Sequence, residues 1–135
     1  MVKEYYPNHP LEQIELRKEE KEGLEKFGNV YIDDFLNYEK DKIKKYKTII
    51  TNPPFSLAKE FLEKCFEISD EDTEIIMLLR LAYLESKKRH DFWQKHPVKQ
   101  LYVLSDRPSF TGQGTDATAY AWFVWSNKEQ LIKVI

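Results

Sequence analysis

The sequence predicts an α/β domain in which short strands alternate with helices. Runs of β-branched and aromatic residues, typical of strands, are separated by stretches whose apolar residues recur at helical spacing. Glycine, proline, asparagine and aspartate mark the breaks between these runs. Because the chain has 135 residues and shows neither repeats nor low-complexity segments, we expect residues 1–135 to form one domain.

The first part of the chain is predicted to form a strand, a helix and two further strands. The first strand covers residues 13–16, and a helix follows over residues 17–27. Gly28 is expected to end that helix, because glycine readily takes the positive φ of a helix stop. Residues 29–32 and 46–51 are the next two predicted strands.

The second part is predicted to add two helices and three strands. Ser56 is expected to cap a helix over residues 57–68, whose apolar side chains face the sheet. The other predicted elements are a strand over residues 73–79, a helix over 82–94, and strands over 101–105 and 119–125 that are joined by a loop containing Gly112 and Gly114.

Composition limits the kinds of partner and compartment that the chain can have. A formal charge of −2, with 33% charged residues, excludes a globally basic nucleic-acid binder, so any contact with a polyanion must be local. The single cysteine, Cys65, excludes an internal disulfide, and neither a signal peptide nor a membrane span is visible. We therefore expect a cytoplasmic protein. The histidines His9, His90 and His96 are too dispersed to predict a metal site.

The segment Asn52-Pro53-Pro54-Phe55, directly after a predicted strand, carries the clearest chemical signal. Two prolines fix φ and remove two backbone donors, so carbonyl acceptors are held rigidly at the end of the strand. Asn52 adds a side-chain carbonyl, and Phe55 adds a ring that can stack. Such a site suits a planar group bearing an NH2, although a proline-stiffened turn that only closes the strand is the alternative.

These four residues match the (Asn/Asp/Ser)-Pro-Pro-(Tyr/Phe) signature of amino-group methyltransferases that use S-adenosylmethionine. Residues 107–125, and their spacing from Asn52, resemble phage and prophage-type DNA adenine-N6 methyltransferases. The resemblance implies a Rossmann-like methyltransferase fold, with an open, mostly parallel sheet, helices on its faces and a late antiparallel strand. It also implies that Asn52, Pro53, Pro54 and Phe55 are catalytic, and that a DNA base must be flipped out of the stack to reach them. RNA bases and glutamine side chains are other substrates of enzymes with this signature.

The same resemblance implies a cofactor-binding role for Glu15, Asp34 and Phe35. Glu15 ends a predicted strand where the family keeps an acidic residue that accepts hydrogen bonds from the cofactor ribose. Asp34 and Phe35 resemble the family's Gly-Asp-Phe-Leu segment, with Asp33 in place of its glycine, which leaves open which aspartate faces the cofactor. A solvated charge at Glu15 and a helix-capping role for Asp34 are the alternatives.

Basic residues in the third predicted helix, over residues 82–94, and after it are candidates for binding DNA. Lys87, Lys88 and Arg89 form a cluster with few acidic neighbours, and Arg107 precedes the glycine-containing loop. Each phosphate that they neutralise would make DNA affinity depend on salt. A solvated helix face, and a packing role for Arg107, are the alternatives.

One feature of the family is expected to be missing. No glycine-rich turn precedes residue 14, where Pro7 and Pro10 interrupt any strand. The segment from Phe110 to Gly114 could supply that turn only in a circularly permuted fold. We therefore expect an amino-terminally truncated fold that needs a second copy or a complementary chain to cover the sheet edge. Three functions stay open: a methyltransferase that needs this complement, a non-catalytic nucleic-acid-binding remnant, and an interaction domain.

Overall fold

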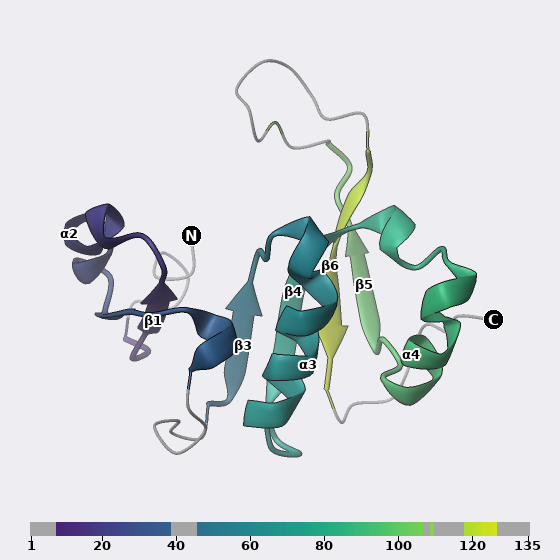
Figure 1. The fold of residues 1–135 in the computed structure, drawn as a ribbon, viewed down its shortest axis with the longest axis horizontal. Helices are drawn as coiled ribbons and strands as arrows, with labels where there is room; N and C mark the ends of the chain where they lie inside the picture. The colour runs from purple at the N-terminus through teal and green to yellow at the C-terminus, as the bar shows by residue number, and fades with distance from the viewer. Residues whose placement is uncertain (1–7, 39–45, 107–108, 110–117, 127–135) are drawn as a thin grey trace. The chain divides into compact units, whose positions relative to one another are not determined.

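The computed structural model describes residues 8–38, 46–106, 109 and 118–126. The chain divides into two compact units, Met1–Lys42 and Ile43–Ile135, and each is described by itself (Figure 1). The single domain expected from the chain length stays a prediction. In the described part of the chain, no helix has both the length and the apolar character needed to cross a membrane.

The first unit is a parallel pair of strands with short helical segments between and after them. Strands β1 (Glu12–Glu15) and β2 (Asn29–Ile32) pair from Glu12 opposite Asn29 to Glu15 opposite Ile32. The predicted helix over residues 17–27 is wrong in extent, because it consists of the 3₁₀ turn η1 (Lys18–Glu20) and the short helix α2 (Lys21–Glu25). A second 3₁₀ turn, η2 (Phe35–Asn37), follows β2.

Gly28 is required in this unit for a different reason from the one predicted. Its φ lies outside the positive range, so a left-handed helix stop is not what selects glycine. A Cβ at this position would overlap the carbonyl oxygen of Leu11 and lie 3.0 Å from both the carbonyl carbon and the Cβ of Leu11. The next amide, of Asn29, donates to that same carbonyl at 3.0 Å. Glycine is needed because the two strands begin in close backbone contact.

The second unit contains a four-stranded sheet in the order β3-β4-β6-β5. Strands β3 (Thr48–Thr51) and β4 (Glu74–Arg80) are parallel, whereas β6 (Tyr120–Trp125) runs antiparallel to both β4 and β5 (Gln100–Val103). This arrangement confirms the predicted α/β class with its late antiparallel strand. Among the described residues this sheet is mixed and not mostly parallel as predicted, because β6 pairs antiparallel with both of its neighbours. The strand predictions are right within a few residues because β-branched and aromatic runs mark these segments.

Helices α3 (Ala58–Ile68) and α4 (His90–Lys95) pack on this sheet (Figure 1). Leu62 and Cys65 of α3 are fully buried. The indole of Trp93 from α4 stacks on Phe123 and on Trp125 of β6, with ring centroids 6.1 and 6.2 Å apart. Phe66 of α3 meets Trp125 edge-on at 6.2 Å. An aromatic core therefore joins both helices to the central strands.

Two predicted helix features are wrong. Ser56 does not cap α3: it lies in the 3₁₀ turn η4 (Phe55–Leu57), and Leu57 is the residue before the helix. The predicted helix over residues 82–94 is broken into η5 (Leu81–Tyr83), η6 (Lys87–Arg89) and α4. The break is explained by Ser86, which is extended and accepts a hydrogen bond from the amide of Lys88 at 3.2 Å.

Candidate active site

The segment Asn52 to Phe55, here called the proline corner, lies where β3 ends and its parallel neighbour β4 continues. Thr51, the last residue of β3, pairs with Met77, and β4 runs on to Arg80 along β6. Asn52 to Phe55 therefore turn away from the sheet beside the carboxyl end of β4. The carboxyl ends of parallel strands are where open α/β sheets bind their ligands.

The corner presents polar acceptors on a buried support. Pro53 is buried, whereas Asn52 and Pro54 are exposed. The Pro54 carbonyl accepts a hydrogen bond from the amide of Leu57 at 2.9 Å, which starts the turn η4. Among the described residues, no donor binds the Pro53 carbonyl and no partner binds the Asn52 side chain. Both groups are thus available to accept hydrogen bonds from N–H groups of a ligand.

Phe55, the last residue of the corner, is half-buried, and Arg80 and Tyr120 are among its neighbours. The guanidinium carbon of Arg80 lies over its ring, 4.6 Å from the centroid. The ring of Tyr120, which is fully buried, lies 5.4 Å away at an interplanar angle of 38°. Arg80 and Tyr120 face each other across β4 and β6. Neither residue was predicted as part of the site, because only this strand register brings them to Phe55.

In the first unit, Glu15 ends β1 as predicted and its carboxylate is bound by Arg17. One carboxylate oxygen accepts hydrogen bonds from the backbone amide of Arg17 at 2.9 Å and from its Nε at 3.1 Å, while the other accepts Nη2 at 3.4 Å. These hydrogen bonds hold the pKa of Glu15 below its usual value. Glu15 is thus an ionised acceptor at the strand end, which fits the role of binding a ribose. Its role in cofactor binding stays a prediction.

Asp34 has the capping role that was its alternative. One of its carboxylate oxygens accepts the amide of Leu36 at 3.0 Å, and the other accepts the side-chain amide of Asn37 at 3.2 Å. Asp33 in turn accepts the amide of Asp34 at 2.8 Å. Phe35 is half-buried in the turn η2. A cofactor contact by Asp34 or Phe35 stays a prediction, and it would have to leave the cap intact.

The three basic residues Lys87, Lys88 and Arg89 have different surroundings in the structure. Lys87 and Lys88 are exposed on the turn η6 and remain candidates for phosphate contact. Arg89 instead donates from Nε to the carbonyl of Tyr83 and from Nη2 to the carbonyl of Glu85, both at 2.9 Å, and its guanidinium lies 4.3 Å from the Tyr83 ring centroid. Arg89 therefore stabilises the break between η5 and η6. Arg107, like Gly112 and Gly114, lies outside the described residues.

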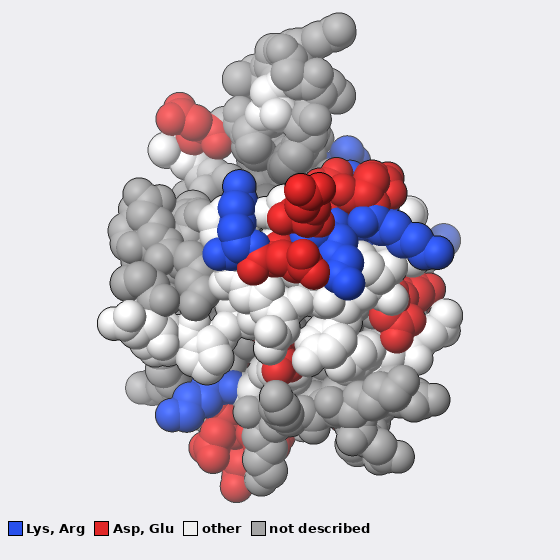
Figure 2. All heavy atoms as spheres, turned by 90° about the vertical axis from the view of Figure 1, so that its left-hand side faces the viewer, with Lys and Arg blue, Asp and Glu red and all other residues white. Residues whose placement is uncertain are grey.

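Charges of both signs alternate on the face of the molecule shown in Figure 2. Ion pairs in the first unit follow the same pattern: Arg17 pairs with Glu15 at 3.1 Å and with Glu20 at 3.2 Å, and Lys21 pairs with Glu25 at 3.6 Å. Solvent-exposed pairs of this kind contribute little to stability. On this face the described residues thus offer no large basic patch for DNA.

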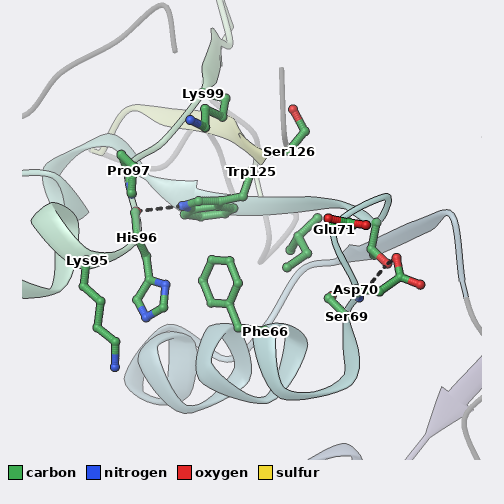
Figure 3. Close-up of a pocket in the computed structure, with 12 residues that line it drawn as sticks. Phe66, Ser69, Asp70, Glu71, Lys95, His96, Pro97, Lys99, Trp125 and Ser126 are labelled. Carbon is green, nitrogen blue, oxygen red and sulfur yellow. Dashed lines mark hydrogen bonds between the residues drawn. The ribbon is translucent and has the colours of Figure 1, made fainter. Parts of the chain in front are cut away.

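A pocket of about 250 Å³ lies at the amino-terminal end of β4, whereas the proline corner lies beside its carboxyl end (Figure 3). Thr73, directly before β4, lines it, together with the rings of Phe66, His96 and Trp125. The His96 and Phe66 rings are stacked with centroids 4.2 Å apart, and Trp125 Nε1 donates to the His96 carbonyl at 3.1 Å. Burial lowers the pKa of His96. This pocket and the proline corner are thus two different sites, at opposite ends of β4.

Within the residues that the structure describes, no three metal-ligating side chains gather at one place. In those residues, too, β3 has a neighbouring strand in the four-stranded sheet on one side only. Its Ile50 side chain is 39% exposed. A second copy or a complementary chain at this edge stays a prediction.

Comparison with solved structures identifies the fold. The chain is similar to PH1948 from Pyrococcus horikoshii, provisionally named an RNA methyltransferase, with a TM-score of 0.62 and 18% identity over 93% of this chain and 64% of that one. It is also similar to the 23S rRNA methyltransferase ErmE, with a TM-score of 0.58 and 12% identity over 92% of this chain and 55% of that one.

A third similar structure is the plantazolicin methyltransferase BpumL in complex with SAH, with a TM-score of 0.58 and 16% identity over 93% of this chain and 70% of that one. No family model and no curated protein matches the sequence. At these identities the similarity establishes a Rossmann-like methyltransferase fold. The chain spans 64% and 55% of the lengths of the first two of these proteins.

Proposed function

We propose that this chain, when a second copy or a complementary chain covers its sheet edge, is an S-adenosylmethionine-dependent methyltransferase that acts on the N6 amino group of a flipped adenine in DNA. The observation that carries this proposal is the proline corner: an exposed Asn52 amide and the Pro53 carbonyl, both without a partner among the described residues, stand at the carboxyl end of β3. The methyltransferase fold supports it, since the corner then occupies the ligand-binding end of the sheet.

The corner can orient an exocyclic amine by accepting a hydrogen bond from each of its two N–H groups. The Asn52 side-chain oxygen takes one hydrogen and the Pro53 carbonyl takes the other, which directs the nitrogen lone pair away from these acceptors. The prolines fix the backbone in advance, so little conformational entropy is lost when the amine binds. When S-adenosylmethionine is bound, it supplies an electrophilic methyl group. The amine gives up one proton to solvent in the overall reaction.

Residues of the first unit would hold the cofactor. The ionised Glu15 carboxylate would accept hydrogen bonds from the ribose hydroxyls, with Arg17 keeping the side chain in place. Asp34 and Phe35 would contact the adenine of the cofactor from the turn η2. Lys87, Lys88 and Arg107 would contact phosphates of the DNA.

DNA is favoured over RNA by the resemblance of residues 107–125, although two of the similar structures are named as RNA methyltransferases. The test is a two-stage experiment. Calorimetric titration with S-adenosylmethionine should show saturable micromolar binding, about −8 kcal/mol, that is weakened in Glu15→Gln. Incubation with DNA and with RNA of the same sequence should then yield N6-methyladenine in DNA.

Asn52→Ala should lower the methylation rate at least about a hundredfold, as loss of a hydrogen-bonding group at a reacting centre commonly does, while cofactor affinity stays unchanged. Methylation of RNA but not of DNA would show that the substrate is RNA. Adenine-dependent DNA binding without cofactor binding would favour the non-catalytic remnant. Equal activity of the Asn52→Ala variant would refute the role of the corner.

A further inference from the structure

Arg80 lies over Phe55, on the ring that would stack against a flipped base. Its guanidinium carbon is 4.6 Å from the ring centroid. That separation is typical of an Arg stacked on an aromatic face, and a base would need the same kind of contact with the ring. A base that stacks on this face of Phe55 would have to displace Arg80.

The fold explains how Arg80 reaches this position. Strand β3 ends at Thr51 opposite Met77, but β4 continues to Arg80, which pairs with Tyr120 of β6. Leu81, the next residue, is fixed by its amide, which donates to the Ala119 carbonyl at 2.8 Å. The backbone at Arg80 is therefore held by strand pairing, whereas its long side chain is exposed.

The charge of Arg80 has no counter-charge in the described part of the chain. No carboxylate there forms an ion pair with it, and no acceptor there forms a hydrogen bond with it. This differs from Arg89, whose guanidinium is bound by backbone carbonyls. A guanidinium presents a fork of donors that matches a phosphate, and a contact with an aromatic face alone leaves those donors in solvent.

We propose that Arg80 covers Phe55 in the free protein and moves, when a flipped adenine stacks there, onto a phosphate of the bound nucleic acid. This inference rests on the proposed function. It gives Arg80 a substrate-binding role: adenine in the corner releases the guanidinium, and the released guanidinium binds the backbone beside it. No bond is made or broken in this step.

The first test is the NMR signal of the Arg80 Nε–H proton. In the free protein it should be shifted by the Phe55 ring current, and Phe55→Leu should remove that shift. A single-stranded oligonucleotide with one adenine should also remove it, whereas the same oligonucleotide with an abasic position in place of the adenine should leave it unchanged. Binding of the adenine oligonucleotide with an unchanged signal would overturn the proposal.

The second test measures affinity for the adenine oligonucleotide as a function of salt. Arg80→Ala should reduce the slope of log K against log salt by about 0.7, the value for one phosphate contact on a single strand. Arg80→Lys, which keeps the charge, should retain most of the slope. Lys47→Ala is the matched control, because it removes an exposed cation before the amino-terminal end of β3, and it should leave the slope unchanged.

The failure of this inference can be told apart from failure of the proposed function. If the wild-type protein binds adenine and abasic oligonucleotides equally, the base pocket itself is refuted, and the role of Arg80 falls with it. If the wild-type protein prefers adenine but Arg80→Ala behaves like Lys47→Ala, the pocket stands and only the role of Arg80 is overturned.

Discussion

Replacing Gly28 by alanine should separate the strands of the first unit. The added Cβ would overlap the Leu11 carbonyl oxygen, which is backbone and cannot rotate away as a flexible side chain could. The same carbonyl accepts the amide of Asn29 at 3.0 Å. Relief of the overlap therefore requires the start of β2 to move off β1, and this hydrogen bond is lost with it.

The cost follows from these two effects. Overpacking against a fixed neighbour costs about 1–3 kcal/mol, and loss of one backbone hydrogen bond costs about 0.5–1.5 kcal/mol. Together they predict a loss of about 1.5–4.5 kcal/mol in the free energy of opening of the first unit, or roughly 10- to 1600-fold faster exchange of its protected amides. The amide of Asp33, which donates to the Glu15 carbonyl at 3.1 Å, reports the far end of the strand pair.

Hydrogen exchange followed by NMR measures this change without assuming that both units unfold together. The matched control is Gly23→Ala in α2, where an added Cβ meets nothing within 4 Å. Alanine is the better helix former, so this variant should be more stable by about 0.5–1 kcal/mol and exchange roughly two- to fivefold more slowly. If Gly28→Ala exchanges like the wild type or like Gly23→Ala, the close contact is not what requires glycine.

Three further predictions concern the second unit. The Cys65 thiol, which is fully buried and whose pKa burial raises to about 12, should react with a disulfide reagent only when the protein unfolds; fast native reaction would contradict its burial. The pKa of His96 is lowered by burial, so unfolded protein binds its proton more readily. The free energy of unfolding should therefore fall as pH drops through the ordinary value of 6.5, and His96→Phe should flatten this dependence while the exposed His90→Gln does not. Leu62→Ala, at a fully buried position, should lower the free energy of unfolding by about 2–5 kcal/mol in urea titration, whereas Leu57→Ala, at a side chain 38% exposed, should change it by less than about 0.5 kcal/mol.

The strands were predictable because their signal is local. The run at residues 29–32 is a strand with the predicted bounds, and the run before the proline corner also forms a strand. The break at Ser86 was not predicted, although a serine that can accept a nearby amide is a recognised helix start. The carbonyls left open by this break are satisfied by the Arg89 side chain, a contact that no helical periodicity encodes.

Some residues of the candidate site could also be predicted from local sequence, whereas others depend on strand pairing. Asn52 and its two prolines could be identified from sequence, because proline restricts the backbone wherever it occurs. The surroundings of Phe55 could not, since Arg80 and Tyr120 reach it only through the pairing of β4 with β6. Gly28 was predicted as a special position, but its reason, a close approach to Leu11, depends on the pairing of β1 with β2.

The central claim is that the proline corner holds an exocyclic amine, and one binding measurement tests it most directly. Fluorescence anisotropy would compare an oligonucleotide carrying one unpaired adenine with the same oligonucleotide carrying purine, which lacks the amino group, at that position. The wild-type protein should bind the adenine oligonucleotide about tenfold more tightly, equivalent to about 1.4 kcal/mol for the amine contacts, and Asn52→Ala should lose most of this preference. Equal affinity of the wild-type protein for both oligonucleotides would contradict the account.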